Sequence, residues 1–454
     1  MAAFIVSSFG LFVMGLFAGL FTTPSWQTFV LLAYGWAVAG GEQQTIATYL
    51  WLSGATTVKH WSRFYAFLGG ALYPLRWQLW GRIIRYAARW VPAAEPIVLA
   101  VDDSTKKKAG RHIEGVGHYR NGAGSARQEY RTLRGLNFVW GMMRVPVPGW
   151  PGQKVSVPIG LSLYLKEEQA RQLQLPYQSR SALAREIVDF VAAQLPTRRI
   201  RVLGDGGYAT KESLRQLPAT VQVVGRMLIT AKLYAPPPPR DQPRRGCPPK
   251  KGLLLGSPKT LARNRAGWQP HPTEAGALVQ AWEGLWHTVL PGRLLRVVVV
   301  RRPTPTRRQP GQRKPPPPVE AFFTTDLTLS LEAILAQYRE RWAVEITIRD
   351  SNGYAGFGQD QCRKHERVVG ANTLRLVLAA ARTLWFVEQA SRTVTLDLTR
   401  HRPWYRHTQA PSQLDIVWAC REALQDAGVF PIPRFAPGLA KIPQEPENTL
   451  PLAA

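Results

Sequence analysis

Short runs of consecutive apolar residues alternate with helix-patterned segments in the first half of the chain. Runs of this kind, typical of buried strands, lie at residues 97–101, 136–147, 155–165, 200–203 and 221–224. Apolar positions four residues apart between 181 and 195 predict a helix that Pro196 ends, and a shorter helix is expected around 211–217. The predicted order is strand, strand, strand, helix, strand, helix, strand. It indicates an α/β fold with a mixed sheet and flanking helices.

Acidic residues stand where two of these strands end. Asp102 and Asp103 directly follow the first run, and Asp205 follows the fourth in a Gly-Asp-Gly-Gly turn. A lone Asp-Gly-Gly is more often a turn than a ligand. In an open α/β sheet, however, sites form at the carboxyl ends of the strands, where distant parts of the chain can meet. Two acidic strand ends that could be neighbours therefore indicate a functional site.

A third carboxylate lies on a predicted helix between residues 331 and 352. Its apolar and aromatic positions recur at steps of three and four residues, and Ser330 suits its N-terminal cap. On such a helix Arg341, Glu345 and Asn352 share about one third of the circumference with Tyr338. The simpler interpretation is a surface ion pair between Arg341 and Glu345. The two upstream strand-end aspartates favour a functional role for Glu345 instead.

Charge narrows the class of partner. The 454 residues carry a formal net charge of +28, which predicts a polyanionic partner. Nucleic acid is the leading candidate, and an anionic membrane surface is the rival. Basic, proline-rich stretches at 235–252 and 301–318 are typical either of phosphate-contacting segments or of solvated linkers. Three cysteines far apart fit neither a zinc site nor a disulfide framework, and they suit a reducing compartment.

The beginning of the chain has no charged residue before residue 42, and residues 4–21 are almost wholly apolar. This length nearly meets the requirement for a membrane span. The run is interrupted by glycines and by Pro24, and no basic segment precedes it. We therefore expect buried helices in this region, and a membrane-anchored basic protein is the alternative.

Three carboxylates that come together repel one another unless a cation neutralises them. Mg²⁺ prefers this oxygen ligation and also binds phosphate oxygens. Two such ions activate a water or a 3′-hydroxyl on one side of a phosphodiester and stabilise the leaving oxygen on the other. The pattern thus predicts phosphoryl transfer on nucleic acid, with Arg341, Arg349 and Lys364 holding phosphates near the metal ions.

The chain resembles the DDE transposases of bacterial insertion sequences, in the subgroup marked by Tyr-x2-Arg-x3-Glu-x6-Lys, whose catalytic core is ribonuclease H-like. The resemblance spans roughly residues 97–365. It rests on Val101-Asp102-Asp103-Ser104, Gly204-Asp205-Gly206-Gly207-Tyr208, Thr325-Asp326-Leu327, and Tyr338, Arg341 and Glu345 at the family spacing. It implies that Asp103, Asp205 and Glu345 are the catalytic residues and hold two Mg²⁺ or Mn²⁺ ions, with Asp102 as the second choice for the first position. The sequence departs from the motif at Asn352, where relatives have lysine, and Arg349 or Lys364 could replace that charge.

The resemblance also implies partners and roles. Such an enzyme binds double-stranded DNA at the terminal inverted repeats, nicks it, and joins the 3′-hydroxyl to target DNA. It acts as a homodimer in a synaptic complex, in the cytoplasm at the nucleoid, with Tyr338 and Arg341 positioning DNA. Trp286, or else Trp282, would stack on a flipped base, against the alternative of core packing. Asn352 leaves open a catalytically weakened or inactive relative that only binds element ends.

Composition shifts, together with what the resemblance implies, predict five regions. Residues 1–95 form a helical DNA-binding region, and 96–235 form the first part of the catalytic core. Residues 236–320 hold basic linkers and a β insertion. Residues 321–395 complete the core with the glutamate helix, and 396–454 form a C-terminal region.

Overall fold

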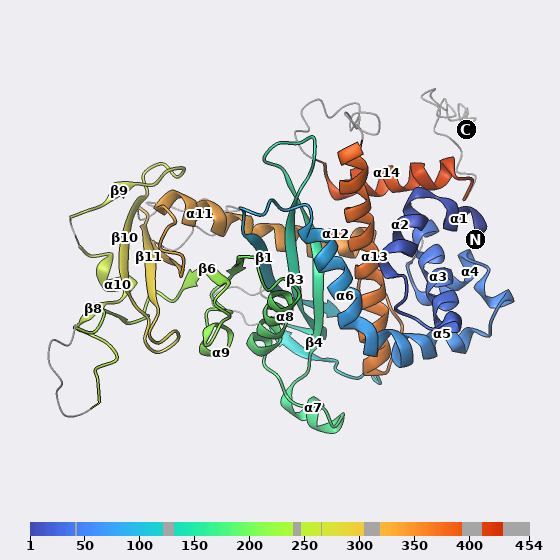
Figure 1. The fold of residues 1–454 in the computed structure, drawn as a ribbon. Coiled ribbons are helices and arrows are strands. Elements are labelled where there is room, and N and C mark those ends of the chain that lie inside the picture. Colours follow the sequence, from blue (N-terminus) through green and yellow to red (C-terminus); the bar gives the residue numbers. More distant parts are fainter. Residues whose placement is uncertain are drawn as a thin grey trace, which may run out of the picture.

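The computed structural model describes residues 1–40, 43–120, 131–238, 247–264, 266–303, 318–392 and 411–429. Most of the predicted C-terminal region and the centres of both basic, proline-rich stretches lie outside the described residues. The described strands form one twelve-stranded mixed sheet, with helices packed around its first half (Figure 1). The predicted α/β class is confirmed.

The core of the sheet contains the five predicted strands. They are β1 (Ile97–Lys107), β3 (Thr132–Pro146), β4 (Lys154–Tyr164), β5 (Ile200–Gly204) and β6 (Val221–Met227). The order across the sheet is β4-β3-β1-β5-β6. The pairs β4/β3 and β3/β1 are antiparallel, and β1/β5 and β5/β6 are parallel. Helix α8 (Arg180–Gln194) connects β4 to β5, and α9 (Lys211–Leu214) connects β5 to β6. This order and these directions define a ribonuclease H-like core.

Strand β1 is longer than its apolar run. Its first five residues are buried, and the strand then continues as far as Lys107 because β3 pairs with it from Leu99 to Lys107. Successive side chains of a strand point to opposite faces. Asp102, Ser104 and Lys106 therefore share one face of the sheet, and Asp103 and Thr105 share the other. The short strand β2 (Gly117–Arg120), which the sequence did not predict, pairs with the start of β3.

The insertion after β6 extends the same sheet. Strand β12 (Val319–Thr324) pairs with β6 and continues into β11 (Leu294–Arg301), β10 (Leu278–Leu285), β7 (Leu233–Tyr234) and β8 (Leu254–Gly256). The small β9 (Gln269–Pro270) pairs with β10, and α10 (Pro258–Leu261) lies nearby. A run of four valines ending at Val300 is fully buried on β11. In Figure 1 the insertion extends away from the helical N-terminal region.

Helices cover the other end of the molecule. The N-terminal ones are α1 (Ala2–Val6), α2 (Ser8–Phe17), α3 (Thr23–Val38), α4 (Ile46–Leu52), α5 (Trp61–Phe67) and α6 (Tyr73–Ala88). Of these, α2 and α6 pack directly against the long α13 (His365–Arg392), and α14 (Gln413–Asp426) lies beside it (Figure 1). Phe9 of α2 is fully buried and meets Trp385 of α13 edge to face. Within the described ranges, the helices are too short or too polar to cross a membrane.

The helix predicted over residues 331–352 is two helices. Helix α11 (Leu331–Glu340) ends at Arg341, where α12 (Trp342–Tyr354) begins. Ser330 caps α11 as predicted, because its hydroxyl accepts a hydrogen bond from the Ala333 amide. At the junction the Val344 amide bonds to the Arg341 carbonyl three residues back, so the chain tightens there. Arg341 is consequently held at the start of α12.

Candidate active site

One guanidinium joins two carboxylates from different elements. Nη1 of Arg341 lies 3.2 Å from Oδ2 of Asp102 on β1, and Nη2 lies 2.9 Å from Oε1 of Glu345 on α12. Arg341 is buried, whereas 41% of the Glu345 side chain is exposed. The predicted Arg341–Glu345 pair therefore exists, and Arg341 also links it to Asp102 on β1.

Asp102 sits in a negative environment. Burial raises the pKa of the Asp102 carboxyl to about 7, and the charges of Asp205 and Asp103 act in the same direction. A hydrogen bond from the Asp103 amide and the charge of Arg341 oppose this rise in the pKa. Strands β1 and β5 pair in parallel as far as Ala100 and Leu203, so their acidic ends lie at the same edge of the sheet, as predicted. An added positive charge would favour the ionised form of Asp102.

Asp205 has one oxygen committed to its turn. Its Oδ1 accepts hydrogen bonds from the amides of Gly207 at 2.8 Å and Tyr208 at 3.3 Å. Its Oδ2 has no hydrogen-bond partner in the part of the chain that the structure describes. The turn fixes the orientation of the carboxylate, and the second oxygen stays available for a ligand.

Asp103 faces the opposite side of the sheet and has both oxygens occupied. Oδ2 accepts hydrogen bonds from Asn137 at 2.7 Å and from Arg180 at 3.3 Å. Oδ1 accepts one from the Tyr208 hydroxyl at 3.1 Å. Burial, followed by the charges of Asp103 and Asp102, raises the pKa of Tyr208 well above its ordinary value, so the hydroxyl remains a donor. It is Asp102, and not Asp103, that the structure brings beside Arg341 and Glu345.

The other residues predicted to contact DNA are Tyr338, Arg349 and Lys364, and their surroundings differ. Tyr338 is half-buried, with its ring 4.6 Å from that of Phe322, and Arg341 lies over its face. Arg349 is largely exposed and pairs with Asp350. Lys364, just before α13, pairs with Glu114 at 2.9 Å.

The two tryptophans of the insertion differ in exposure. Trp286 is only 3% exposed and packs edge-on against Phe323, which is the core-packing alternative. In this position its ring has no face open to DNA. Trp282 on β10 is half-buried. Asp326, which the resemblance also includes, is buried and bonds to Arg201 at 2.6 Å, so it fixes the end of β12 against β5.

Three residues around Asp103 escaped sequence reasoning. Asn137 and Arg180 come from β3 and from the start of α8, and no spacing in the sequence links them to Asp103. Tyr208 belongs to the motif Gly204-Asp205-Gly206-Gly207-Tyr208, but the motif alone did not predict its hydrogen bond to Asp103.

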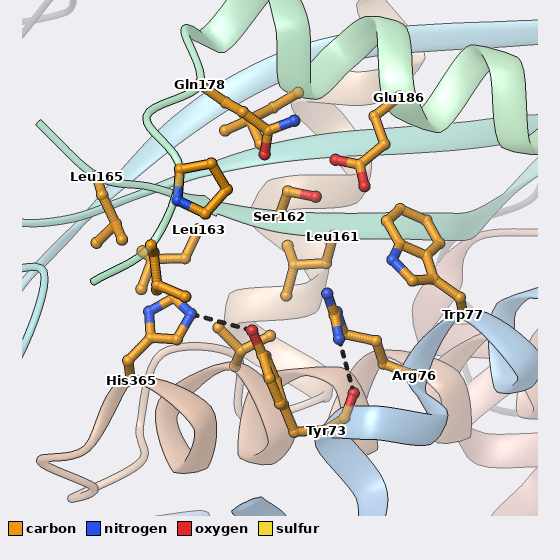
Figure 2. A pocket seen from close by; sticks show the side chains of 14 residues that line it. Tyr73, Arg76, Trp77, Leu161, Ser162, Leu163, Leu165, Gln178, Glu186 and His365 are labelled. Carbon is orange, nitrogen blue, oxygen red and sulfur yellow. Dashed lines mark hydrogen bonds between the residues drawn. The ribbon is translucent and has the colours of Figure 1, made fainter. Parts of the chain in front are cut away.

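A separate cavity of the molecule does not contain the carboxylates of the candidate site. It has a volume of about 440 Å³ and lies between β4, α6, α8 and α13 (Figure 2). Nε2 of His365 lies 3.4 Å from the Tyr73 hydroxyl, and Arg76 donates to the Tyr73 carbonyl oxygen. Glu186 is the one carboxylate in its lining. The three carboxylates of the candidate site lie outside this cavity.

The donor chemistry of the site fits a divalent cation. Asp102, Asp205 and Glu345 offer oxygen ligands of the kind Mg²⁺ or Mn²⁺ prefers. A bound cation would oppose the rise in the pKa of Asp102, which burial mainly causes. In the described part of the chain, no three acidic, histidine or cysteine side chains are gathered closely enough to enclose an ion. Arg341 stands between Asp102 and Glu345 instead.

The strand order and the acidic ends of β1 and β5 define the class as a ribonuclease H-like protein. A family model described as DDE superfamily endonuclease matches residues 50–288, more than half of the chain. The chain belongs to this family of DNA-acting endonucleases, which generally use divalent metal ions. The matched region contains Asp102, Asp103 and Asp205 and ends before Glu345. No curated protein matches the chain.

Proposed function

We propose that this protein is a transposase of an insertion sequence. It would bind the inverted repeats at the ends of its own element, cut the DNA there, and join the freed 3′-hydroxyl to a target strand. The observation that carries this proposal is the link from Asp102 through Arg341 to Glu345, with Asp205 close by. The net charge of +28 supports a DNA partner.

The proposed catalytic carboxylates are those of Asp205, Glu345 and one aspartate of β1. The motif assigns Asp103, because it directly precedes the hydroxyl residue Ser104. The contacts favour Asp102, because its carboxyl shares a face with Arg341 and Glu345. Asp103 is already bonded through both oxygens, which suits a residue that positions its neighbours.

These carboxylates would hold Mg²⁺ or Mn²⁺, as two ions, which supply an activated water or 3′-hydroxyl and charge neutralisation at the scissile phosphate. Arg341 would hold Glu345 in place and favour the ionised form of Asp102 through its positive charge. Tyr338, half-buried beside Arg341, would contact DNA with its open edge.

We also propose the regional roles. Residues 1–95 would contribute to binding the element ends, residues 96–235 and 321–395 would form the catalytic core, and two copies of the chain would bring two ends together. The second candidate is a relative that binds ends without cutting them. It is favoured by Asn352, which carries no charge and whose buried Oδ1 has no hydrogen-bond partner within the described part of the chain.

A plasmid cleavage assay separates the two candidates. The substrate is a supercoiled plasmid carrying the DNA that flanks the coding sequence on both sides. With Mg²⁺ or Mn²⁺, we expect the wild type to nick this plasmid at the flanks and to join the ends to a second plasmid. With EDTA we expect binding without nicking. The matched control is the same plasmid without the flanks. Binding of the flanks without nicking in either metal would favour the inactive relative and contradict the proposed enzyme.

A further inference from the structure

Lys106 is a half-buried lysine on the same face of β1 as Asp102. Its Nζ lies 5.4 Å from the centre of the Phe357 ring, and it has no carboxylate partner among the described residues. Lys108, two residues further along this face, is buried and paired with Asp360 at 3.4 Å. Only one of these two neighbouring ammonium groups is therefore neutralised by the protein.

Helix α12 runs alongside β1 from Asp102 to Lys106. Arg341, just before the helix, contacts Asp102. Gly358, four residues after the last residue of the helix, lies so close to Lys106 that a Cβ on the glycine would come 2.9 Å from Cδ of the lysine. Strand β1 and helix α12 thus run in the same direction, with the start of α12 near Asp102 and the chain after α12 near Lys106.

From this alignment we expect Lys106 to lie near the level of Asn352, close to the end of α12. The four residue-to-residue steps along the strand from Asp102 to Lys106 cover about 13 Å. The eleven helical residues from Arg341 to Asn352 cover about 16 Å. Asn352 follows Glu345 by seven residues, so both lie on the face of α12 that carries the site.

The other candidate cations are already engaged. The guanidinium of Arg349 is paired with Asp350, and its side chain is 74% exposed. Lys364 is paired with Glu114. Neither lies unpaired on the carboxylate face of β1, whereas Lys106 lies on that face and has no carboxylate partner among the described residues.

We infer that Lys106 binds a DNA phosphate beside the scissile bond and supplies from β1 the positive charge that related motifs place at position 352. This inference rests on the proposed function, since it assumes DNA at the carboxylates. Burial lowers the pKa of Lys106 to about 8, so the ammonium is poorly compensated in the absence of DNA. A phosphate oxygen would provide the missing counter-charge.

The test moves the positive charge from position 106 on β1 to position 352 on α12. Lys106→Met keeps most of the stem and removes the charge. Lys107→Met is the matched control, because it removes the same charge from the exposed neighbour on the opposite face. We expect cleavage of the flank-bearing plasmid to fall roughly 100-fold in Lys106→Met and to stay within about threefold in Lys107→Met. Adding Asn352→Lys to Lys106→Met should recover at least about tenfold of the loss.

Thermal midpoints give a second measurement that does not depend on cleavage. Asn352→Lys alone should lower the midpoint, because it places an ammonium group beside Lys106, and Lys106→Met should relieve that loss. If the changes in thermal midpoint caused by Asn352→Lys and Lys106→Met simply add in the double variant, positions 106 and 352 are not close to each other. Cleavage by Lys106→Met within threefold of the wild type, or a loss that Asn352→Lys does not rescue, would overturn the phosphate contact.

Failure of the proposed function would look different. In that case the wild type itself shows no metal-dependent cleavage. The affinity of the wild type and of Lys106→Met for a labelled flank duplex then decides the phosphate contact. Weaker binding by Lys106→Met than by Lys107→Met supports the contact, and equal binding by the two variants contradicts it.

Discussion

Asp102→Asn is expected to abolish DNA cleavage and, at the same time, to make the folded chain more stable at pH 8. Removal of a carboxylate from the proposed metal site should reduce cleavage at least about 1000-fold, because the cation loses a charged ligand. The gain in stability follows from the raised pKa of Asp102, about 7 against an ordinary value of 3.8. Above pH 7 the folded chain holds a buried negative charge that the asparagine variant lacks.

The pH dependence of this gain has a definite sign. A carboxyl whose pKa is higher in the folded than in the unfolded chain binds its proton more tightly when folded, so its contribution to stability is lost as the pH rises from about 4 to about 7. Without metal, the unfolding free energy of Asp102→Asn should exceed that of the wild type by about 1 to 3 kcal/mol at pH 8. The difference should shrink toward pH 4. Thermal unfolding across this range, in EDTA, measures it.

Asp103→Asn is the matched control, since it removes the same charge from the adjacent residue. Its carboxylate accepts three side-chain hydrogen bonds, from Asn137, Arg180 and Tyr208, and its loss should weaken the fold rather than stabilise it. If Asp103→Asn abolishes cleavage and Asp102→Asn leaves it intact, Asp102 is not the catalytic aspartate of β1. Asp103, which the family motif assigns, is then the catalytic residue.

Arg341→Met is expected to destabilise the protein strongly in the absence of metal. The guanidinium bridges Asp102 and Glu345, and its removal leaves two carboxylates without their counter-charge. Removal of one partner from a largely buried ion pair costs about 3 to 5 kcal/mol, and the partial exposure of Glu345 reduces this to roughly 2 to 4 kcal/mol at pH 8. Because protonation of Asp102 relieves the repulsion, the loss should be smaller at pH 5.

Chemical unfolding with and without Mg²⁺ measures this effect. The divalent cation should restore part of the lost stability in Arg341→Met, because it replaces the missing positive charge. Arg349→Met is the control, since this exposed pair with Asp350 should change stability by less than about 1 kcal/mol. Equal losses for the two variants, or no effect of Mg²⁺ on Arg341→Met, would count against a site built around Arg341.

The core strands could be predicted because their signal is local. Continuous apolar runs at β1, β3, β4, β5 and β6 correspond to strands buried within the sheet. The extension of β1 to Lys107 had no such signal, since its second half is polar and depends on pairing with β3. The pairing of β12 with β6 is equally non-local, so the sequence indicated an insertion without showing that it continues the sheet.

The candidate site was predictable in composition and less so in geometry. The four-residue spacing predicted the contact between Arg341 and Glu345. The choice between Asp102 and Asp103 depends on which face of β1 meets α12, and adjacent residues of a strand differ in this respect. The sequence did not indicate a role for Lys106 either, because its role also depends on which face of β1 meets α12. Membership in the DDE superfamily endonucleases is established, whereas the subgroup with the Tyr-x2-Arg-x3-Glu-x6-Lys motif stays a prediction.

Cleavage of the flank-bearing plasmid by Glu345→Gln tests the central claim most directly. Glu345 lies outside the matched family region, and among the described residues its carboxylate bonds only to Arg341. The substitution keeps the shape of the side chain and removes its charge. We predict that Glu345→Gln binds the flanks as the wild type does and fails to nick them in Mg²⁺ or Mn²⁺, whereas the wild type nicks. Equal nicking by the two proteins would contradict a catalytic site that includes α12.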